Sequence, residues 1–167
     1  GTLTMGQPKV VEVVPAHGRT TDEVLAVAAA VEKGSDHPLA LAILERHGER
    51  PTEPVGGFLN IEGKGARAEV GGRTVFIGNR RLMDEERIDL AGLAAEADRL
   101  KGAGRTVVHV AENGVPAGLI AIADAPRPSA SRTLKALRER GVQVAMLTGD
   151  NAGTAKRIAE ELGGIDI

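Results

Sequence analysis

Val142-Gln143-Val144-Ala145-Met146-Leu147-Thr148-Gly149-Asp150-Asn151 is an apolar run that ends in a hydroxyl, a glycine and a carboxylate. Helical patterns precede it over residues 129–140 and follow it over residues 153–162. This alternation predicts a strand over residues 142–147 in a parallel sheet, where ligands bind at the carboxyl ends of the strands. Thr148 and the Gly149 amide can hold phosphoryl oxygens there, and Asp150 can serve Mg²⁺. A strand-to-helix turn capped by Asp150 or Asn151 would explain the same residues.

The residues before this segment follow a different pattern. Apolar spacing predicts helices over residues 21–33, from Ser35 or Asp36 to about residue 47, and over residues 90–102. Strands are predicted over residues 9–14, 66–70, 73–77, 106–111 and 115–123, with Gly71-Gly72 closing a hairpin. The change of pattern places a domain boundary near residues 116–124. Asp124 is interpreted as a hinge residue there, paired with Arg127 or capping the next helix.

The composition excludes several kinds of partner. With 21 basic and 23 acidic residues, the formal net charge of -2 gives no electrostatic footprint for nucleic acid. No apolar run approaches the roughly 18 residues that a membrane-spanning helix needs. Cysteine is absent, so disulfides and thiolate metal sites are excluded. Because Trp and Tyr are also absent, a base-stacking surface must use Phe58, Phe76, a histidine or aliphatic packing.

The segment Ser35-Asp36-His37-Pro38-Leu39-Ala40 places a histidine at the start of a predicted helix. An imidazole there can pack flat against a purine, and Glu32 is close enough in sequence to orient the ring or to accept from an adenine amine. A His-Pro pair that simply begins a helix is the alternative. The other histidines have no metal-ligand spacing with one another or with His37, so we expect them to be surface or packing residues: His17, His47 and His109.

Two glycine segments lie near the predicted hairpin. Gly63-Lys64-Gly65 lies between two strands, and its glycines allow a backbone to approach a ligand closely. A β-bulge or a hairpin is the alternative explanation of these glycines. Gly78-Asn79-Arg80 ends a strand, where the Asn79 amide can bind ribose or phosphate and Arg80 can pair with phosphate. A capped turn with an exposed arginine is the alternative there.

Taken together, the segments resemble the cytosolic ATP-binding region of heavy-metal-transporting P-type ATPases. Gly1-Thr2-Leu3-Thr4 matches the last four residues of that family's phosphorylation motif, Asp-Lys-Thr-Gly-Thr-Leu-Thr. Ser35-Asp36-His37-Pro38-Leu39 matches its Ser-Glu-His-Pro-Leu hallmark with one acidic exchange, and Glu32 also matches. The two glycine segments and Thr148-Gly149-Asp150-Asn151 follow in the family's order, so the resemblance covers essentially the whole chain.

The resemblance implies an α/β (α+β) fold with two parts. Residues 6–117 would form a nucleotide-binding domain, an antiparallel sheet flanked by helices. Residues 1–5 and 118–167 would form part of a haloacid-dehalogenase-like phosphorylation domain. It implies that ATP is the ligand, with Mg²⁺ in the intact enzyme, and it assigns the site residues. Glu32 and His37 would hold adenine; Gly63, Gly65, Gly78, Asn79 and Arg80 would serve ribose and phosphates; Thr148, Gly149 and Asp150 would act on the transferred phosphoryl group.

Several parts of the family pattern are expected to be missing from this chain. The acceptor aspartate would precede Gly1, and the later Gly-Asp-Gly motif, the phosphate-binding lysine, the actuator domain and the membrane helices are not in the sequence. Phosphoryl transfer needs the acceptor, Mg²⁺ and charge neutralisation together. We therefore expect this chain to bind ATP without catalysis, and its partners to be the remaining domains of the same polypeptide and no nucleic acid.

The intact protein would then couple ATP hydrolysis, through an aspartyl-phosphate, to export of zinc, cadmium, cobalt or copper. This chain would be a cytosolic domain of an integral protein of the plasma or inner membrane. A soluble haloacid-dehalogenase-type phosphatase would use Thr148 and Asp150 equally well. A non-catalytic nucleotide-binding module would bind ATP and lack an acceptor aspartate in the full-length protein.

Overall fold

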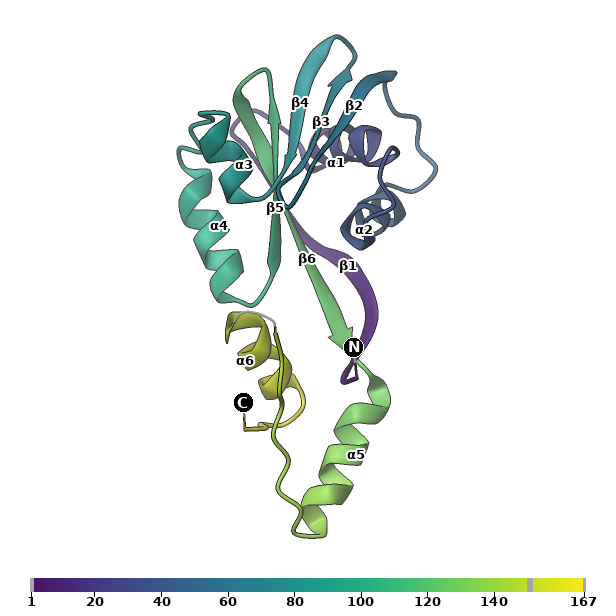
Figure 1. The fold of residues 1–167 in the computed structure, drawn as a ribbon, viewed down its shortest axis with the longest axis vertical. Helices are drawn as coiled ribbons and strands as arrows, with labels where there is room; N and C mark the ends of the chain where they lie inside the picture. Colours follow the sequence, from purple (N-terminus) through teal and green to yellow (C-terminus); the bar gives the residue numbers. More distant parts are fainter. Residues whose placement is uncertain (1, 150–151, 167) are drawn as a thin grey trace.

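A six-stranded antiparallel sheet dominates the computed structural model, which describes residues 2–149 and 152–166. Its strand order is β1-β6-β5-β4-β3-β2, so the first and last strands along the chain are neighbours at one edge (Figure 1). The strands are β1 (Thr4–Pro15), β2 (Val55–Ile61), β3 (Gly65–Val70), β4 (Arg73–Gly78), β5 (Thr106–Glu112) and β6 (Val115–Pro126). The predicted hairpin at Gly71-Gly72 is confirmed, with Val70 opposite Arg73.

Helices cover both faces of this sheet because its central strands are apolar on both sides. In β5, Val108 and Val110 pack into the core beneath α1 (Thr21–Glu32) and α2 (Pro38–His47). On the opposite face, Val107 and Ala111 pack into the core beneath α3 (Arg80–Glu85) and α4 (Leu93–Gly102). Successive side chains of a strand point to opposite faces, which explains how one strand serves two cores.

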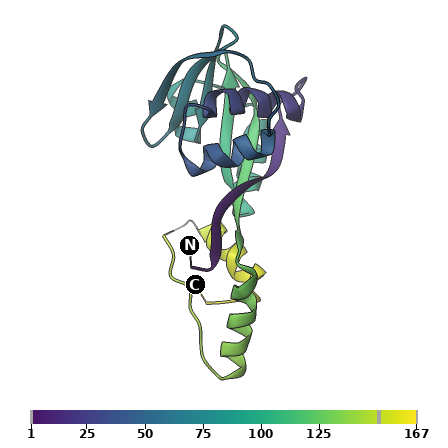
Figure 2. The same ribbon diagram turned by 90° about the vertical axis from the view of Figure 1, so that its right-hand side faces the viewer.

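The edge strand β1 and its neighbour β6 continue beyond the sheet as a two-stranded ribbon (Figure 2). The ribbon contains a register shift between Thr4 and Pro8. At this shift the Asp124 carboxylate accepts hydrogen bonds from the amides of Gly6 at 2.9 Å and Gln7 at 3.2 Å. Asp124 therefore holds the irregular turn of β1, and it does not cap the next helix, whose first turn follows Arg127.

The helices α5 (Pro128–Glu139) and α6 (Ala152–Glu161) lie at the end of the ribbon (Figure 1). Ala130 and Leu134 of α5 pack on Ile158 and on Leu162, which follows α6, and form a small separate core. We call residues 127–166 the C-terminal unit. Hydrogen bonds join α6 to the loop before β5 and to β6: Thr154 Oγ1 donates to the Gly104 carbonyl at 3.3 Å, and Arg157 donates to the Asp124 carbonyl at 3.1 Å.

The predicted strand over residues 142–147 is wrong for most of its length. Among the described residues, Ala145 forms one isolated parallel bridge with Asp166, and the Met146 amide donates to the Asp166 carbonyl at 2.7 Å. Val144 and Met146 still turn their side chains toward the small core of the C-terminal unit. Only Val144 and Met146 of this segment are half-buried, whereas Val142 and Leu147 are exposed, and a strand also requires a neighbour with which to pair.

Two further findings concern the described residues as a whole. Within residues 2–149 and 152–166, no helix has the length and apolar character required to cross a bilayer. The same residues contain no cluster of three or more histidine or carboxylate side chains that could hold a metal ion.

Candidate functional site

The two glycine segments of the sequence meet in space because β3 and β4 pair in register. Gly65 and Gly78 are opposite one another, and Gly65 has a φ of +147°. A Cβ on Gly65 would lie 2.6 Å from the Cα of Gly78, and a Cβ on Gly78 would lie 2.9 Å from the Cα of Gly65. Both positions therefore exclude any side chain, because the backbones of the two segments approach each other closely there. We call Gly63, Lys64, Gly65, Gly78 and Asn79 the glycine platform.

Asn79 joins the two halves of the platform. Its backbone amide donates to the Lys64 carbonyl at 2.8 Å, and its side-chain amide donates to the Gly63 carbonyl at 2.9 Å. Its side-chain oxygen accepts from the Leu82 amide at 3.1 Å and so caps α3. The short helix α3 was not predicted, because six residues are too few to show a helical period. Asn79 thus fixes the platform itself, in addition to any contact with a ligand.

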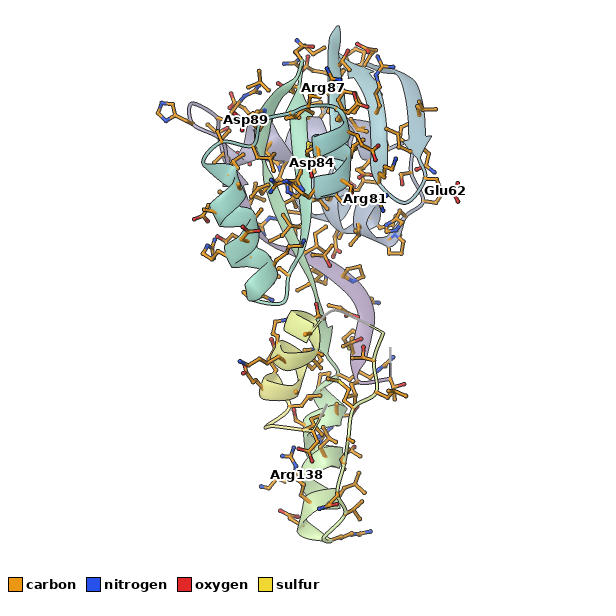
Figure 3. The ribbon with its side chains drawn as sticks, turned by 60° about the vertical axis from the view of Figure 1, so that its left-hand side comes forward. Glu62, Arg81, Asp84, Arg87, Asp89 and Arg138 are labelled. Atoms are coloured by element: carbon orange, nitrogen blue, oxygen red, sulfur yellow. The ribbon has the colours of Figure 1, made fainter. Side chains whose placement is uncertain are left out.

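The two cations beside the platform are paired with acidic residues of α3. Lys64 Nζ lies 2.6 Å from a carboxylate oxygen of Glu85, and Arg80 Nε lies 3.1 Å from one of Asp84. Figure 3 shows Asp84 and Arg81 on the outer side of this helix, and Glu62 projecting from the turn beside Gly63. All these ion pairs reach solvent, so each is weak and can be exchanged for an incoming phosphate. The platform therefore offers positive charge that is balanced until an anion arrives.

His37 is the N-cap of α2, in place of the predicted Ser35 or Asp36. Its Nδ1 accepts from the Leu39 amide at 3.2 Å, and its own amide donates to the Ser35 hydroxyl at 3.2 Å. The Nδ1 that accepts carries no proton, so in the neutral ring the Nε2 carries it and can donate. The ring is exposed, which leaves it accessible to a ligand.

Glu32 and Phe58 complete the surroundings of this segment. Burial raises the pKa of the Glu32 carboxyl, and a hydrogen bond with the Ser35 side chain partly opposes that rise. The ring of Phe58, on the edge strand β2, lies against Gly34, where a Cβ would be 2.9 Å from two ring atoms. Phe76, the other aromatic residue, packs into the core beneath α3 and α4. Composition identified Phe58 as one of two possible stacking residues, and its place beside Gly34 favours it over Phe76.

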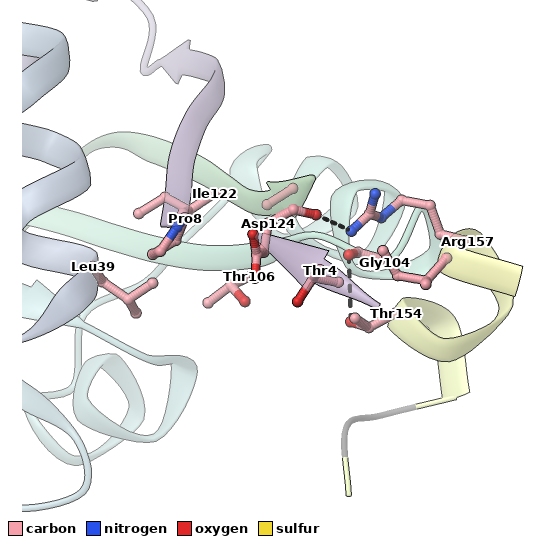
Figure 4. Close-up of a pocket in the computed structure, with 11 residues that line it drawn as sticks. Thr4, Pro8, Leu39, Gly104, Thr106, Ile122, Asp124, Thr154 and Arg157 are labelled. Carbon is pink, nitrogen blue, oxygen red and sulfur yellow. Dashed lines mark hydrogen bonds between the residues drawn. The ribbon is translucent and has the colours of Figure 1, made fainter. Parts of the chain in front are cut away.

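A cavity of about 250 Å³ lies where α2, the ribbon and α6 approach one another (Figure 4). Its wall includes Leu39 of the His-Pro segment, Thr4 of the Gly-Thr-Leu-Thr segment, and Asp124, Thr154 and Arg157. The structure therefore brings the Gly-Thr-Leu-Thr segment close to the His-Pro segment. This convergence needs the fold, because Thr4 and Leu39 belong to different elements.

The structure describes only part of the segment Thr148-Gly149-Asp150-Asn151. Thr148 is half-buried and Gly149 is exposed, and a Cβ on Gly149 would meet nothing within 4 Å. Asp150 and Asn151 lie outside the described residues, as does Gly1. The assignment of Thr148, Gly149 and Asp150 to the transferred phosphoryl group therefore stays a prediction.

Comparison with known proteins agrees with this arrangement. A sequence profile of the haloacid dehalogenase-like hydrolases matches residues 1–167. The probable copper-exporting P-type ATPase V of Mycobacterium tuberculosis is 41% identical over 166 residues, which make up 98% of this chain and 22% of that protein. This chain thus spans about a fifth of the length of such relatives.

Solved structures give the same result. A zinc-transporting PIB-type ATPase in its E2.Pi state has a TM-score of 0.87 at 36% identity, covering 100% of this chain and 27% of that one. The catalytic domain of the CPx-ATPase CopB-B, solved to describe changes upon nucleotide binding, has a TM-score of 0.72 at 26% identity over 99% of this chain and 57% of that one. The predicted resemblance and the predicted fold class are confirmed. This chain belongs to the haloacid dehalogenase-like hydrolase family, and the relatives that it matches are heavy-metal P-type ATPases.

Proposed function

We propose that this chain is the ATP-binding region of a metal-exporting P-type ATPase. The glycine platform carries this proposal, because glycine-rich backbone beside exchangeable cations suits the sugar and phosphates of a nucleotide. Gly63, Gly65 and Gly78 supply the close approach, while Lys64 and Arg80 exchange Glu85 and Asp84 for phosphate oxygens. The similarity to the CopB-B domain supports a nucleotide as the ligand.

In this proposal the adenine is bound by the segment between α1 and α2. The Nε2–H of His37 donates to the base, and the carboxyl of Glu32 lies at the other end of the segment to receive its amine. Gly34 lies between Glu32 and His37 in the sequence. The ring of Phe58 packs on Gly34 and supplies an apolar wall. His37 is held in orientation by the Leu39 amide, so the base meets a ring that is already positioned.

The ribbon is proposed to be the hinge between the two parts of the chain. Residues 6–117 would be the nucleotide-binding domain, and residues 1–5 with 118–167 would be part of the phosphorylation domain. The register shift between Thr4 and Pro8 interrupts the regular ladder at this boundary. Bending there would bring ATP toward an acceptor aspartate of the intact protein. Phosphorylation of that aspartate would drive export of the metal. The names of the relatives give copper, silver or zinc, so the metal itself is not assigned.

Mg²⁺ is proposed to act in the intact enzyme, where it supplies charge neutralisation to the transferred phosphoryl group. Asp150 would be its protein partner here, beside the hydroxyl of Thr148. In the full-length protein this region would face the cytosol and work with the actuator, the rest of the phosphorylation domain and the membrane domain.

The experiment is a calorimetric titration of the chain with ATP, ADP and AMP, with and without Mg²⁺. Loss of one good hydrogen bond or stacking contact should weaken binding by about 5- to 150-fold, or roughly 1–3 kcal/mol. Because His37 also caps α2, His37→Ala would remove two functions at once. His37→Ser keeps a capping oxygen and removes only the ring, so it is the decisive variant. Binding to His37→Ser as tight as to the wild type would place the adenine elsewhere.

A soluble phosphatase of the same family remains distinguishable. It would hydrolyse phosphate esters without forming a nucleotide complex at the glycine platform. ATP binding that is abolished by Gly65→Ala, with no effect of the same variant on the binding of inorganic phosphate, would speak against the phosphatase.

A further inference from the structure

The buried side of the glycine platform rests on a histidine. His109, in β5, is directly opposite Gly78 in the sheet and is 3% exposed. Its Nδ1 lies 3.2 Å from the Gly78 carbonyl oxygen. A carbonyl only accepts, so Nδ1 carries the proton and donates it. In the neutral ring Nε2 is then an acceptor, and within the described part of the chain this buried atom has no hydrogen-bond partner.

The surroundings of the ring oppose a second proton. Burial lowers the pKa of His109, the hydrogen bond to Gly78 opposes this, and the charges of Arg80 on α3 and Lys101 on α4 lower the pKa further, whereas Asp84 on α3 raises it. On the sheet side, the cross-strand neighbours Gly78 and Leu119 carry no titratable group. A proton on Nε2 would therefore create a buried, unpaired cation beneath the platform.

We propose that His109 is a positioning residue of the nucleotide site, whose neutral imidazole fixes the Gly78 carbonyl and thereby the geometry of the glycine platform. This inference rests on the proposed binding of ATP at that platform. The reason is local, because Gly78 has no side chain that could hold its peptide in place by packing. Its neighbours Lys64 and Gly65 contact it through their backbone atoms. The N–H of the same peptide, on Asn79, donates to the Lys64 carbonyl at 2.8 Å, and His109 holds the carbonyl at the other end of that peptide.

The proposal implies a pH response with a definite sign. Above about pH 6.5, the ordinary value, the ring is neutral in both the folded and the unfolded chain, and its contribution is complete. As the pH falls from there through the lowered pKa, the unfolded or locally opened chain binds the proton more readily than the folded one. Acid therefore favours release of the ring from beneath α3, and ATP affinity falls with the platform.

The test compares two substitutions at His109 with a matched one elsewhere. His109→Phe keeps the ring volume and removes both the donor and the titration. His109→Asn places an amide donor near the position of Nδ1 and removes the titration, together with part of the ring volume. His47→Phe is the control, because His47 is also a buried histidine, 4% exposed and bonded to the Arg50 carbonyl, at the far end of α2. That end is about 15 Å from His37 at 1.5 Å per residue.

The measurement is ATP affinity of the 167-residue chain by calorimetry, at about pH 8 and about pH 5, with urea midpoints as the check on folding. We expect His109→Phe to bind about tenfold more weakly at the higher pH, since a buried carbonyl loses its donor. His109→Asn should retain the affinity at the higher pH and lose part of the fall seen in the wild type at the lower pH. The other titratable groups are common to all variants and cancel in the comparison.

The outcomes separate the two proposals. Equal affinity of the wild type and His109→Phe at both values of pH would overturn the role of His109 and leave the ATP site standing. An identical fall of affinity with acid in the wild type and in His109→Asn would also overturn it, and this comparison decides the matter if His109→Phe does not fold. Failure of the folded wild type to bind ATP at either pH would overturn the proposed function and this inference with it.

Discussion

Replacement of Gly78 by alanine is the most direct test of the glycine platform. The new methyl group would lie 2.9 Å from the Cα of Gly65 and 2.9 Å from a methyl of Leu82. Carbon atoms pack at about 3.5–4.0 Å, so these contacts require the two turns to separate by about 0.6–1.1 Å. The Lys64 carbonyl oxygen, which would lie closer still to the new methyl, must also move. The bond from the Asn79 amide to the Lys64 carbonyl, now 2.8 Å, would then exceed a normal hydrogen-bond length.

The expected cost follows from the bonds that this movement breaks. The Asn79 amide loses Lys64, and the Asn79 side chain loses the Gly63 carbonyl. At about 0.5–1.5 kcal/mol each, the free energy of unfolding should fall by about 1–3 kcal/mol. Urea unfolding followed by circular dichroism measures the change. ATP affinity should fall as well, because the platform no longer presents a continuous backbone surface.

Gly56→Ala is the matched control. Gly56 also lies in a strand, β2, and a Cβ there would meet nothing within 4 Å, so its stability should change by less than about 0.5 kcal/mol. Equal stabilities of the two variants would refute the packing of the two turns. A loss of stability in Gly78→Ala with unchanged ATP affinity would keep the packing and refute the platform as the nucleotide site.

Three further predictions concern the surroundings of the site. Glu32→Gln should raise the free energy of unfolding near pH 7, because the buried carboxylate costs stability above its raised pKa. In urea titrations this gain in stability should vanish toward pH 4.5. A gain that is the same at both values of pH would contradict the proposed cause. Gly104→Ala should release α6, since its Cβ would lie 2.6 Å from the Gly153 carbonyl oxygen. Limited proteolysis should then cut the C-terminal unit faster than in the control variant Gly114→Ala, because Gly114 has a similar φ but open space around its Cβ position. Asp124→Asn should speed hydrogen exchange of the Gly6 amide by about tenfold, as a charged acceptor becomes neutral, and unchanged exchange would show that Asp124 does not hold the turn.

The helices and the hairpin were predictable from the sequence because their signals are local. Val24, Val27 and Val31 recur at helical spacing in α1, and all three are buried. Strand β2 was predicted poorly, since its residues are exposed on both faces and carry Gly56 and Gly57, so no alternation marks it. The segment 142–147 shows the opposite error. Its apolar residues predicted a strand, but among the described residues it has no neighbouring strand with which to pair.

The site divides in the same way. The individual glycines, His37 and Glu32 could be singled out from motifs, and the order of the motifs indicated a nucleotide. Their mutual placement could not be obtained, since the contact of Gly65 with Gly78 depends on the register of two strands. The use of the His37 ring as a helix cap was missed as well, because Ser35 and Asp36 are the usual capping residues and both lie just before it. His109 carried no signal in the sequence, since only its register places it under Gly78.

The adjacency of β1 and β6 has a consequence for how such a chain can change over time. Lys9 lies opposite Ala123 and Pro8 opposite Asp124, so the chain enters and leaves the sheet at neighbouring points. Paired residues of an antiparallel ladder are about 5 Å apart, a distance fixed by the ladder and not by what lies between them. The residues in between form an insert that can be enlarged, trimmed or exchanged for that of a relative while the flanking sequence stays in place. Evolution can therefore tune the nucleotide-binding part and the C-terminal unit separately, although they are one continuous polypeptide.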